Sequence, residues 1–413
     1  MKLSIIICIY NTAIDYLAEC IESITNSTLK ELDGNYEICM VDDGSTVDYT
    51  DLVNKYRINY KKTENRGILA ARTTGVEMAS GDYAAFCDSD DTVSFHYHLP
   101  MVKKADETGA DIVINDWAFH TPKMRYYCKN DDLIKYDLDV TGDDTLLSFV
   151  KQGGRQHSFY VLWNKHYKTT LLRQAFELLK HSDYPKNSSY SEDAAINFFA
   201  WRDATRVVNI HTGFYFYRIH DSQSVNVVSE QKLRTQINSM AACLTLMREN
   251  IGDNIYQERI LEHIREWEEL MARSHYSHAV ENQYTELYTL LKECYHVNTL
   301  SRTTSKDGYA YTGNILLGTN FKQVEELLFS LWESPICQTA AYNWHDPYIN
   351  RCVSNLIEAG KIEIVKKRRA VVLIPNLSSP LKLKLLHNDT LYKMGLFFFK
   401  KGSKLRKFLK RFV

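Results

Sequence analysis

The sequence predicts an α/β fold in which a mostly parallel sheet carries helices on both faces and is followed by a helical C-terminal region. Two observations support this prediction. Short runs rich in β-branched residues alternate with segments of helical spacing through the first part of the chain. Polar clusters follow directly where three of the predicted strands end, as expected for a parallel sheet with a binding site at one edge.

The predicted elements of the first part alternate between strand and helix. Residues 3–9 are rich in isoleucine and form the first strand, after which Ile14, Leu17, Ile21 and Ile24 recur at helical spacing. The later elements are strands at 36–41, 58–63 and 83–87 and a helix at 67–79. Because such units join neighbouring strands by crossover helices, a parallel sheet is the economical arrangement.

Clusters of polar residues stand at three strand ends: Tyr10 and Asn11, then Asp42 to Ser45, then Asp88 to Asp91. The carboxyl ends of parallel strands share one edge of the sheet, so these clusters are expected to converge on one site. Taken singly, the two acidic clusters also fit solvated turns, because Asp and Gly are common turn residues.

The stretch YAAFCDSDD at 83–91 runs from apolar side chains into three carboxylates. Asp88, Asp90 and Asp91 would repel one another unless they are solvated, hydrogen-bonded or joined by a cation. Hard oxygen ligands favour Mg²⁺ or Mn²⁺ over zinc, and a diphosphate is the obvious partner of such a cation. The stretch therefore predicts either a solvated turn or a metal site.

Composition limits the class of protein. The 413 residues are 45% hydrophobic and 24% charged, which suits a soluble globular chain with a large core. A net charge of −1 gives no indication of nucleic-acid binding. The nine cysteines are scattered without a CxxC pair, which favours reduced thiols and a cytoplasmic protein. The apolar run at the N-terminus is too short for a signal peptide, and no apolar run reaches the roughly 18 residues that span a bilayer.

The blocks SIIICIYN, VDDGST, NRGILAARTTG, ASGDY and FCDSDD occur in this order. They resemble the family 2 glycosyltransferases of the GT-A fold, in particular those of bacterial cell-surface polysaccharide synthesis, which use nucleotide-sugar donors. Further blocks of the resemblance lie at 162–172, 191–199 and 214–224. Two departures, at Cys8 and at Thr73-Thr74-Gly75, remove no charged group.

The resemblance implies a donor site. It assigns Asp43 to the nucleotide base and Tyr10 to stacking or a backbone contact beside it. Asp88, Ser89 and Asp90 match the DXD motif, in which Asp90 is the direct ligand of Mn²⁺ or Mg²⁺ and Asp88 binds the ribose or a water on the metal. Asp42 is then structural.

Four further residues are carried over with alternatives. Arg72 lies either near the donor phosphates or in a salt bridge with a carboxylate such as Asp43. Arg218 and His220 match a late block whose basic groups lie near the diphosphate, which makes His220 a further candidate metal ligand; a lone His at a strand end is also an ordinary surface or core group. Asp91 is outward-facing or structural.

The resemblance also supplies a general base. Asp193 matches the second acid of the family's ED block, which is the usual catalytic base of inverting members, and Glu192 is the second candidate. From the residues alone, these acids fit a helix start after a Ser cap, where they complement the helix dipole. Trp163 and Lys165 either line the acceptor side or are plain core and surface residues.

The predicted organisation has four parts: a nucleotide-sugar glycosyltransferase domain at 1–225, a helical bundle at 226–300, a mixed region of unassigned role at 301–395 and a basic amphipathic tail at 396–413. The helices of the bundle follow from apolar residues at helical spacing in 230–250, 255–276 and 284–297. The bundle serves intramolecular packing, an oligomer interface or acceptor binding. A strand is also predicted within 366–375.

The tail carries seven Lys and Arg residues and no acid, interleaved with Phe and Leu. As a helix it would place Leu405, Phe408, Leu409 and Phe412 on one face, the pattern of an interfacial membrane helix. A disordered basic tail is the alternative. The predicted location is the inner face of the cell membrane, with an anionic lipid surface as partner and no nucleic acid.

Together these features predict a metal-dependent inverting glycosyltransferase that moves a sugar from a nucleoside-diphosphate sugar to a glycan or lipid-linked acceptor, with homo-oligomer formation left open. The alternatives are a nucleotidyltransferase that makes nucleotide sugars and a non-catalytic nucleotide- or glycan-binding protein. The glycine-rich N-terminal loop expected of the former is absent, and the carboxylates at Asp90 and Asp193 count against the latter.

Overall fold

The computed structural model describes residues 1–120, 126–129, 134, 136–186, 188, 190–220, 229–297, 314–318, 362–367 and 370–375. The chain divides into two compact units. The first comprises Met1–Trp117 with Asp131–Ala310, and the second comprises Ala118–Asn130 with Tyr311–Val413. Each unit is described by itself.

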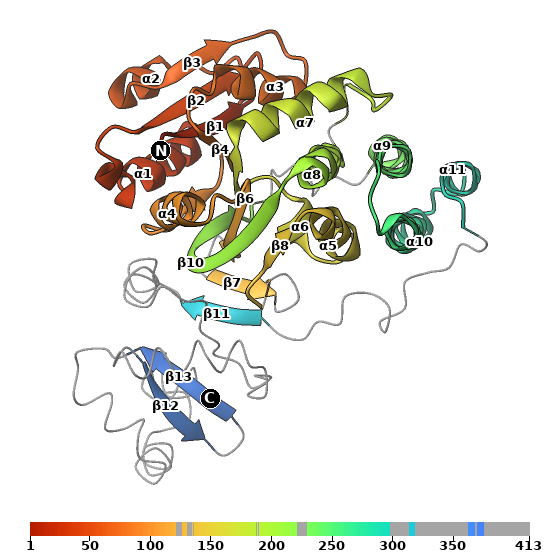
Figure 1. Cartoon of the computed structure of the whole chain (residues 1–413). Coiled ribbons are helices and arrows are strands. Elements are labelled where there is room, and N and C mark those ends of the chain that lie inside the picture. Colours follow the sequence, from red (N-terminus) through yellow and green to blue (C-terminus); the bar gives the residue numbers. More distant parts are fainter. Residues whose placement is uncertain are drawn as a thin grey trace, which may run out of the picture. The chain divides into compact units, whose positions relative to one another are not determined.

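A parallel sheet forms the N-terminal half of the first unit (Figure 1). The strand β1 lies between β2 and β4, and β3 pairs with the far side of β2; all these pairings are parallel. The elements are β1 (Leu3–Ile9), α1 (Ile14–Thr25), η1 (Thr28–Leu32), β2 (Tyr36–Asp42), α2 (Thr50–Tyr56), β3 (Asn59–Lys62), α3 (Ile68–Met78) and β4 (Tyr83–Asp88). The α/β prediction and the order of these elements are confirmed.

Helices cover both faces of this sheet. Successive side chains of β4 point to opposite faces, and neighbouring residues of this strand contact different helices. Cys87 lies against Cys20 of α1, whereas Phe86 packs on Phe176 of a later helix, α7 (Thr169–His181). The helix α3 approaches the sheet closely at Gly75. A Cβ atom there would lie 2.3 Å from Cγ2 of Ile6 in β1, so a larger residue would force either α3 or the Ile6 side chain to shift.

Antiparallel strands extend the sheet beyond β4, a feature that the sequence did not predict. The strand β9 pairs with β4 and with β6, and β10 pairs with β5, β6 and β8. The bounds are β5 (Thr92–Val93), α4 (His98–Thr108), β6 (Ile112–His120), β8 (Asp139–Thr141), α5 (Asp143–Gly153), α6 (His157–Tyr160), β9 (Lys165–Lys168), α8 (Glu192–Asp203) and β10 (Arg206–Arg218).

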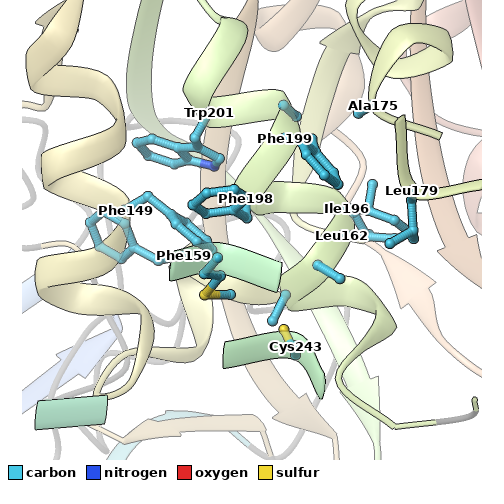
Figure 2. Close-up of a cluster of buried hydrophobic side chains, with 14 of the residues drawn as sticks. Phe149, Phe159, Leu162, Ala175, Leu179, Ile196, Phe198, Phe199, Trp201 and Cys243 are labelled. Atoms are coloured by element: carbon cyan, nitrogen blue, oxygen red, sulfur yellow. The ribbon is translucent and has the colours of Figure 1, made fainter. Parts of the chain in front are cut away.

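The helix α8 is buried along almost its whole length. Every residue from Ala194 to Trp201 is shielded from solvent. Figure 2 shows Trp201, Phe198 and Phe199 of α8 among side chains of the surrounding helices. The Trp201 ring lies 5.8 Å from that of Phe149 and 5.5 Å from that of Phe159. This packing fixes the position of the N-terminus of α8, where the two candidate base residues lie.

Helices follow the sheet, as predicted: α9 (Glu230–Glu249), α10 (Gln257–Glu281) and α11 (Leu287–Cys294). The hydroxyl of Ser229 caps α9 by accepting a hydrogen bond from the backbone N–H of Lys232. The helix α9 packs on α8, and α10 packs on α5. The bundle therefore supports the back of the helix that carries the candidate base. The domain boundaries at 225, 300 and 395 stay predictions.

In the second unit, β7 (Tyr126–Lys129) pairs with the last residues of β6 and with β11 (Asn314–Gly318). A separate hairpin joins β12 (Ile362–Lys367) to β13 (Ala370–Pro375), which confirms the strand predicted there. The predicted tail at 396–413 and most of 301–395 lie outside the described residues. None of the helices in the described part of the chain is both long and apolar enough to cross a bilayer.

Candidate active site

A cleft of about 790 Å³ opens at the carboxyl ends of β1, β2 and β4. The chain segments that line it come from three strand ends, the start of α1, the first half of α3, the start of α8, and β10 with the segment after it. The lining residues are Cys8, Ile9, Tyr10, Asn11, Thr12, Ala13, Tyr16, Asp43, Asn65, Gly67, Ile68, Ala71, Arg72, Asp88, Ser89, Asp90, Glu192, Tyr217 and His220. The predicted convergence of the strand-end clusters is thus present.

Asp43 lies on the cleft wall just beyond β2. Its two carboxylate oxygens accept hydrogen bonds from the backbone N–H groups of Arg66 (2.9 Å) and Gly67 (2.8 Å). The neighbouring Gly44 has φ +82°, and a Cβ there would lie 2.8 Å from the backbone nitrogen of Asn65. The glycine therefore lets the turn after β2 approach the turn before α3 and hold the carboxylate in place.

Asp42, by contrast, is fully buried and does not line the cleft. It accepts hydrogen bonds from the backbone N–H of Ser45 and from the Tyr60 hydroxyl, both at 2.7 Å. Burial alone would raise the pKa of Asp42, but these hydrogen bonds and Lys62 lower it. The side chain ties β2 to β3, which agrees with the structural role expected for it.

Tyr10 stands at the rim of the cleft with 57% of its surface exposed. The next residue, Asn11, adopts φ +49° and is held on both sides. Its backbone N–H donates to the Ser45 hydroxyl at 2.8 Å, and its side-chain oxygen accepts from the backbone N–H of Thr46 at 2.9 Å. The Tyr10 ring is therefore displayed from a fixed turn, where a planar group could stack on it.

The DSDD turn lies on the end of β10, although the two are far apart in sequence. Asp91 is buried and accepts hydrogen bonds from the Tyr215 hydroxyl and from the backbone N–H of Arg218, both at 2.7 Å. The same Tyr215 hydroxyl lies 2.9 Å from the backbone nitrogen of Asp88, which donates to it. Asp91 is thus structural, and the outward-facing alternative for it is wrong.

Asp90 and His220 meet at the cleft, with Oδ2 of the carboxylate 2.8 Å from Nε2 of the imidazole. Asp88 lies beside them on the same turn. Desolvation outweighs the attraction of Arg72 and raises the pKa of Asp88 to about 6. Within the described residues, no group of three or more His, Cys, Asp or Glu side chains is arranged to hold a metal ion.

Arg218 does not line the cleft. Its Nε donates to the backbone carbonyl of Asp90 at 2.6 Å, its Nη2 forms an ion pair with Glu19, and its guanidinium lies over the Tyr16 ring at 4.6 Å. In this arrangement Arg218 holds the turn that carries Asp90.

Arg72 is buried at the floor of the cleft and contacts three carboxylates. Its Nη1 bonds to Asp193 and, at 3.0 Å, to Glu192, while Nη2 lies 3.7 Å from Asp88. Burial alone would lower the pKa of Arg72, but the three acids raise it. Of the two alternatives for this residue, the salt bridge is present, but with these acids rather than with Asp43.

The two candidate bases begin α8 without the expected cap, because the Ser191 side chain makes no capping hydrogen bond and its φ is +62°. The prediction of a Ser cap is therefore wrong. Burial and the neighbouring Asp193 raise the pKa of Glu192 to about 7, against the attraction of Arg72. The Asp193 side chain keeps 19% exposure, and its Oδ2 accepts from the backbone N–H of Leu162 at 3.4 Å.

For Trp163 and Lys165 the structure excludes the acceptor-side alternative and leaves that of core residues. Trp163 is buried and stacks on Tyr215 with ring centroids 4.5 Å apart, and Lys165 is fully buried, so neither lines the cleft. The sequence interpretation also missed Tyr215 as the residue that holds the DSDD turn. Tyr215 lies within the block at 214–224, but only the antiparallel pairing with β5 brings its hydroxyl to the turn.

Comparisons with known proteins agree with this architecture. The model of glycosyl transferase family 2 matches residues 4–199. Glycosyltransferase GlyA of Streptococcus pneumoniae is 28% identical over 61% of this chain and 35% of its own length. Cholesterol galactosyltransferase of Borreliella burgdorferi is 28% identical over 63% of this chain and 73% of its own length. The putative glycosyltransferase EpsH and the uncharacterized glycosyltransferase EpsJ of Bacillus subtilis are matched over 62% and 60% of their own lengths. The chain therefore spans about a third of GlyA and about three fifths of each Bacillus subtilis relative.

Among solved structures, S. aureus TarS 1-349 superposes with a TM-score of 0.54 at 16% identity, covering 92% of this chain and 98% of TarS 1-349. The same TarS fragment has been solved in complex with UDP-GlcNAc, and that structure superposes with a TM-score of 0.51 at 15% identity. At such identities the likeness concerns the fold alone. With the fold, the strand-end cleft and the family match in agreement, residues 4–199 form a glycosyl transferase family 2 domain.

Proposed function

We propose that the chain is a metal-dependent inverting glycosyltransferase that moves a sugar from a nucleoside-diphosphate sugar to a hydroxyl group of a glycan or lipid-linked acceptor. The observation that carries the proposal is the single cleft at the carboxyl ends of β1, β2 and β4. It brings together Asp43, Asp88, Asp90, Arg72 and Glu192 from four separate parts of the chain. A donor with a base, a diphosphate and a sugar needs this variety of groups along one cleft.

The nucleotide end of the donor would bind at the side of Tyr10 and Asp43. A base stacked on the exposed Tyr10 ring could donate an N–H to Asp43, since the two backbone hydrogen bonds leave lone pairs of this carboxylate unused. Asp88, at the next strand end, is left for the ribose. The UDP-GlcNAc complex of TarS supports a nucleotide sugar as the ligand of this fold.

The residues at the DSDD turn fit a divalent cation delivered with the donor. Mg²⁺ is commonly held by one or two carboxylates together with substrate phosphates, so a three-residue protein cage is not required. Asp90 would be the main ligand, with Asp88 and His220 beside it. When bound, Mn²⁺ or Mg²⁺ would neutralise charge on the departing diphosphate. The Arg218 contacts to the turn would hold Asp90 in position.

Asp193 is the proposed general base. It would accept the proton of the acceptor hydroxyl as that oxygen bonds to the anomeric carbon and the bond from this carbon to the diphosphate breaks. The ion pair with Arg72 and the hydrogen bond from the backbone N–H of Leu162 hold this carboxylate in one orientation. Glu192 shares the same guanidinium and lines the cleft, whereas Asp193 is not among the lining residues. Asp193 is the proposed base because of the family resemblance and its greater side-chain exposure, 19% against 9% for Glu192.

The proposed acceptor is a hydroxyl group of a glycan or lipid-linked molecule. The relatives differ widely in what their names state, and GlyA is more than twice as long as the matched segment. A role in cell-surface polysaccharide synthesis rests on the resemblance described for the sequence. Binding to the inner face of the membrane through residues 396–413 rests on the charge pattern of that tail alone.

The test is a screen of nucleoside-diphosphate sugars for slow hydrolysis by the purified chain, with Mn²⁺ and with a chelator. The proposal expects hydrolysis of at least one nucleotide sugar that stops when the metal is removed. A nucleotidyltransferase would instead join a nucleoside triphosphate to a sugar phosphate and release pyrophosphate. A non-catalytic binder would show thermal stabilisation by a nucleotide sugar without any turnover, and either of these results would overturn the proposal.

A further inference from the structure

We propose that Lys165 is a positioning residue for Asp193, acting through the backbone of residues 161 and 162. This inference rests on the proposed function, since it gives a task to a residue that serves the proposed base. Lys165 is the first residue of β9 and does not line the cleft. Its effect on the reaction would be indirect, through the orientation of the Asp193 carboxylate.

Lys165 has no exposed surface, which is unusual for a lysine. Its Nζ donates to the backbone carbonyl of Val161 and, at 2.8 Å, to Oδ1 of Asn164. Among the described residues, no carboxylate forms an ion pair with it. Burial lowers the pKa of Lys165 well below its ordinary value. The attraction of Asp193 opposes this effect of burial, and the amine donates to the two oxygens named above.

The segment held by Lys165 also contacts Asp193. Val161, whose carbonyl accepts from Lys165, is followed by Leu162, whose N–H lies 3.4 Å from Oδ2 of Asp193 and donates to it. The other carboxylate oxygen, Oδ1, bonds to Arg72. The carboxylate is therefore held between a guanidinium on one side and this backbone N–H on the other.

Asn197, one turn along α8, fastens the same segment from the helix side. Its Nδ2 lies 2.7 Å from the carbonyl of Tyr160, 3.3 Å from that of Val161 and 3.0 Å from that of Asp193, and donates toward each. The carbonyl of Val161 is thus shared by Lys165 and Asn197. Displacement of this carbonyl would move the adjoining Leu162 N–H relative to Asp193.

The choice of lysine itself supports a polar task. Burying an amine without hydrogen-bond partners is strongly unfavourable, and a methionine would fill a similar volume without that penalty. A lysine at a fully buried site is therefore justified only by the two oxygens that it binds. The adjacent Asn164 is buried as well and donates to the carbonyls of Ser158 (3.2 Å) and Asn115 (3.4 Å), which anchors the same segment.

The experiment is a double-mutant cycle with Lys165→Met and Asp193→Asn, measured as metal-dependent hydrolysis of the nucleotide sugar that the wild type cleaves. Lys165→Met is expected to lower kcat by roughly 10- to 100-fold, because small misplacements of a reacting group have effects of this size. The donor KM should change little, since Lys165 lies outside the cleft. In the Asp193→Asn background the same substitution should cause no further loss.

Lys168→Met is the matched control. Lys168 lies on the same strand, has half of its side chain exposed and forms an ion pair with Asp111 at 3.3 Å. This ion pair does not involve residues 161 and 162. The Lys168→Met variant should hydrolyse the donor at the wild-type rate. If Lys165→Met does not fold, Asn197→Leu tests the same carbonyl from α8 and should give the same loss of kcat and the same absence of further loss with Asp193→Asn.

The outcomes separate this inference from the proposed function. Losses that multiply in the double variant, or a raised donor KM with unchanged kcat, would overturn the positioning role while leaving Asp193 as the base. If Asp193→Asn alone hydrolyses the donor normally, the assignment of the base fails and the inference fails with it. Wild-type kcat in Lys165→Met would also overturn it.

Discussion

At the scale of single residues, one guanidinium organises the reactive end of the cleft. Arg72 bonds to Glu192 and Asp193 on α8 and lies near Asp88 on β4, so it joins the proposed base to the DSDD turn. The guanidinium of Arg72 is buried, so removal of any one acid would leave its positive charge less well compensated in a site shielded from water. The three acids share this partner, but the proposed function gives them different tasks: Asp193 is the base, Glu192 is a partner of Arg72 and Asp88 binds the donor.

Asp193→Asn tests the chemical task. The amide keeps a similar shape and can still accept from Leu162, but it cannot take a proton from the acceptor. Sugar transfer should fall by about 100-fold or more, while donor affinity stays within a few-fold of the wild type. Steady-state kinetics and donor titration measure the two quantities. Near-normal turnover in a folded variant would move the role to Glu192 or to another group.

Glu192 gives a prediction about pH. Its pKa is about 7 in the folded chain and near 4.5 when unfolded, because burial and Asp193 outweigh Arg72. A raised carboxyl pKa stabilises the fold fully below pH 4.5, and this contribution disappears as the pH rises through about 7. The free energy of unfolding of the wild type should therefore decline relative to Glu192→Gln over this window, by up to about 3 kcal/mol. Chemical denaturation at several pH values measures the difference, with the exposed Glu77→Gln as control; a pH-independent difference would contradict it.

At the scale of elements, the sequence is most informative where the residue pattern within a single strand, helix or turn identifies that element. The strand LSIIICI, the helix after Gly67 and the acidic turn after β4 were all predicted from local pattern, and the structure has them at 3–9, 68–78 and 88–91. The antiparallel strands β9 and β10 were harder to place, because pairing partners far apart in sequence decide their position.

The site shows the same limit. Residue types at strand ends predicted that Tyr10, Asp43 and Asp90 would gather in one cleft, since parallel strands present the same ends to one edge. The pairing of Arg72 with acids more than a hundred residues away could not be predicted from spacing. Nor could the burial of Lys165, because a lysine in a short strand gives no sign of which face it occupies.

Gly75→Ala tests how closely α3 must approach the sheet. The added Cβ would lie 2.3 Å from Cγ2 of Ile6 in β1, so either α3 or the Ile6 side chain must shift. The gain in helix propensity is at most about 1 kcal/mol, whereas overpacking costs about 1 to 3 kcal/mol, so net destabilisation is expected. Thermal unfolding measures it, with Glu77→Ala on the exposed side of α3 as control. A variant as stable as the wild type would show that the contact is looser than described.

At the scale of the whole molecule, the family 2 domain at 4–199 is continuous with a helical bundle that packs on α8. The bundle adds no cleft residue within the described part of the chain, so its evident contribution is to support the helix that begins with Glu192 and Asp193. The basic tail is a separate matter, and its role can be tested without reference to the cleft.

Removal of residues 396–413 should release the chain from anionic lipid vesicles. Each of the seven cations is expected to add about 1 kcal/mol near such a surface, and the Phe and Leu side chains would add apolar burial. Hydrolysis of the soluble donor should continue, because the cleft residues lie far from the tail in sequence. Co-sedimentation of full-length and shortened chains with vesicles decides the matter. Equal sedimentation of both would show that the tail does not serve membrane binding.

The central claim is that the cleft binds a nucleoside diphosphate together with a divalent cation at Asp90. The direct measurement is calorimetric titration of the wild type and Asp90→Asn with the nucleoside diphosphate of the active donor, with and without Mn²⁺. The exposed Asp106→Asn on α4 serves as a control for loss of one negative charge. The account predicts Mn²⁺-dependent binding by the wild type and the control, and loss of that dependence in Asp90→Asn at an unchanged melting temperature. Equal Mn²⁺-dependent affinity in all of these proteins would contradict it.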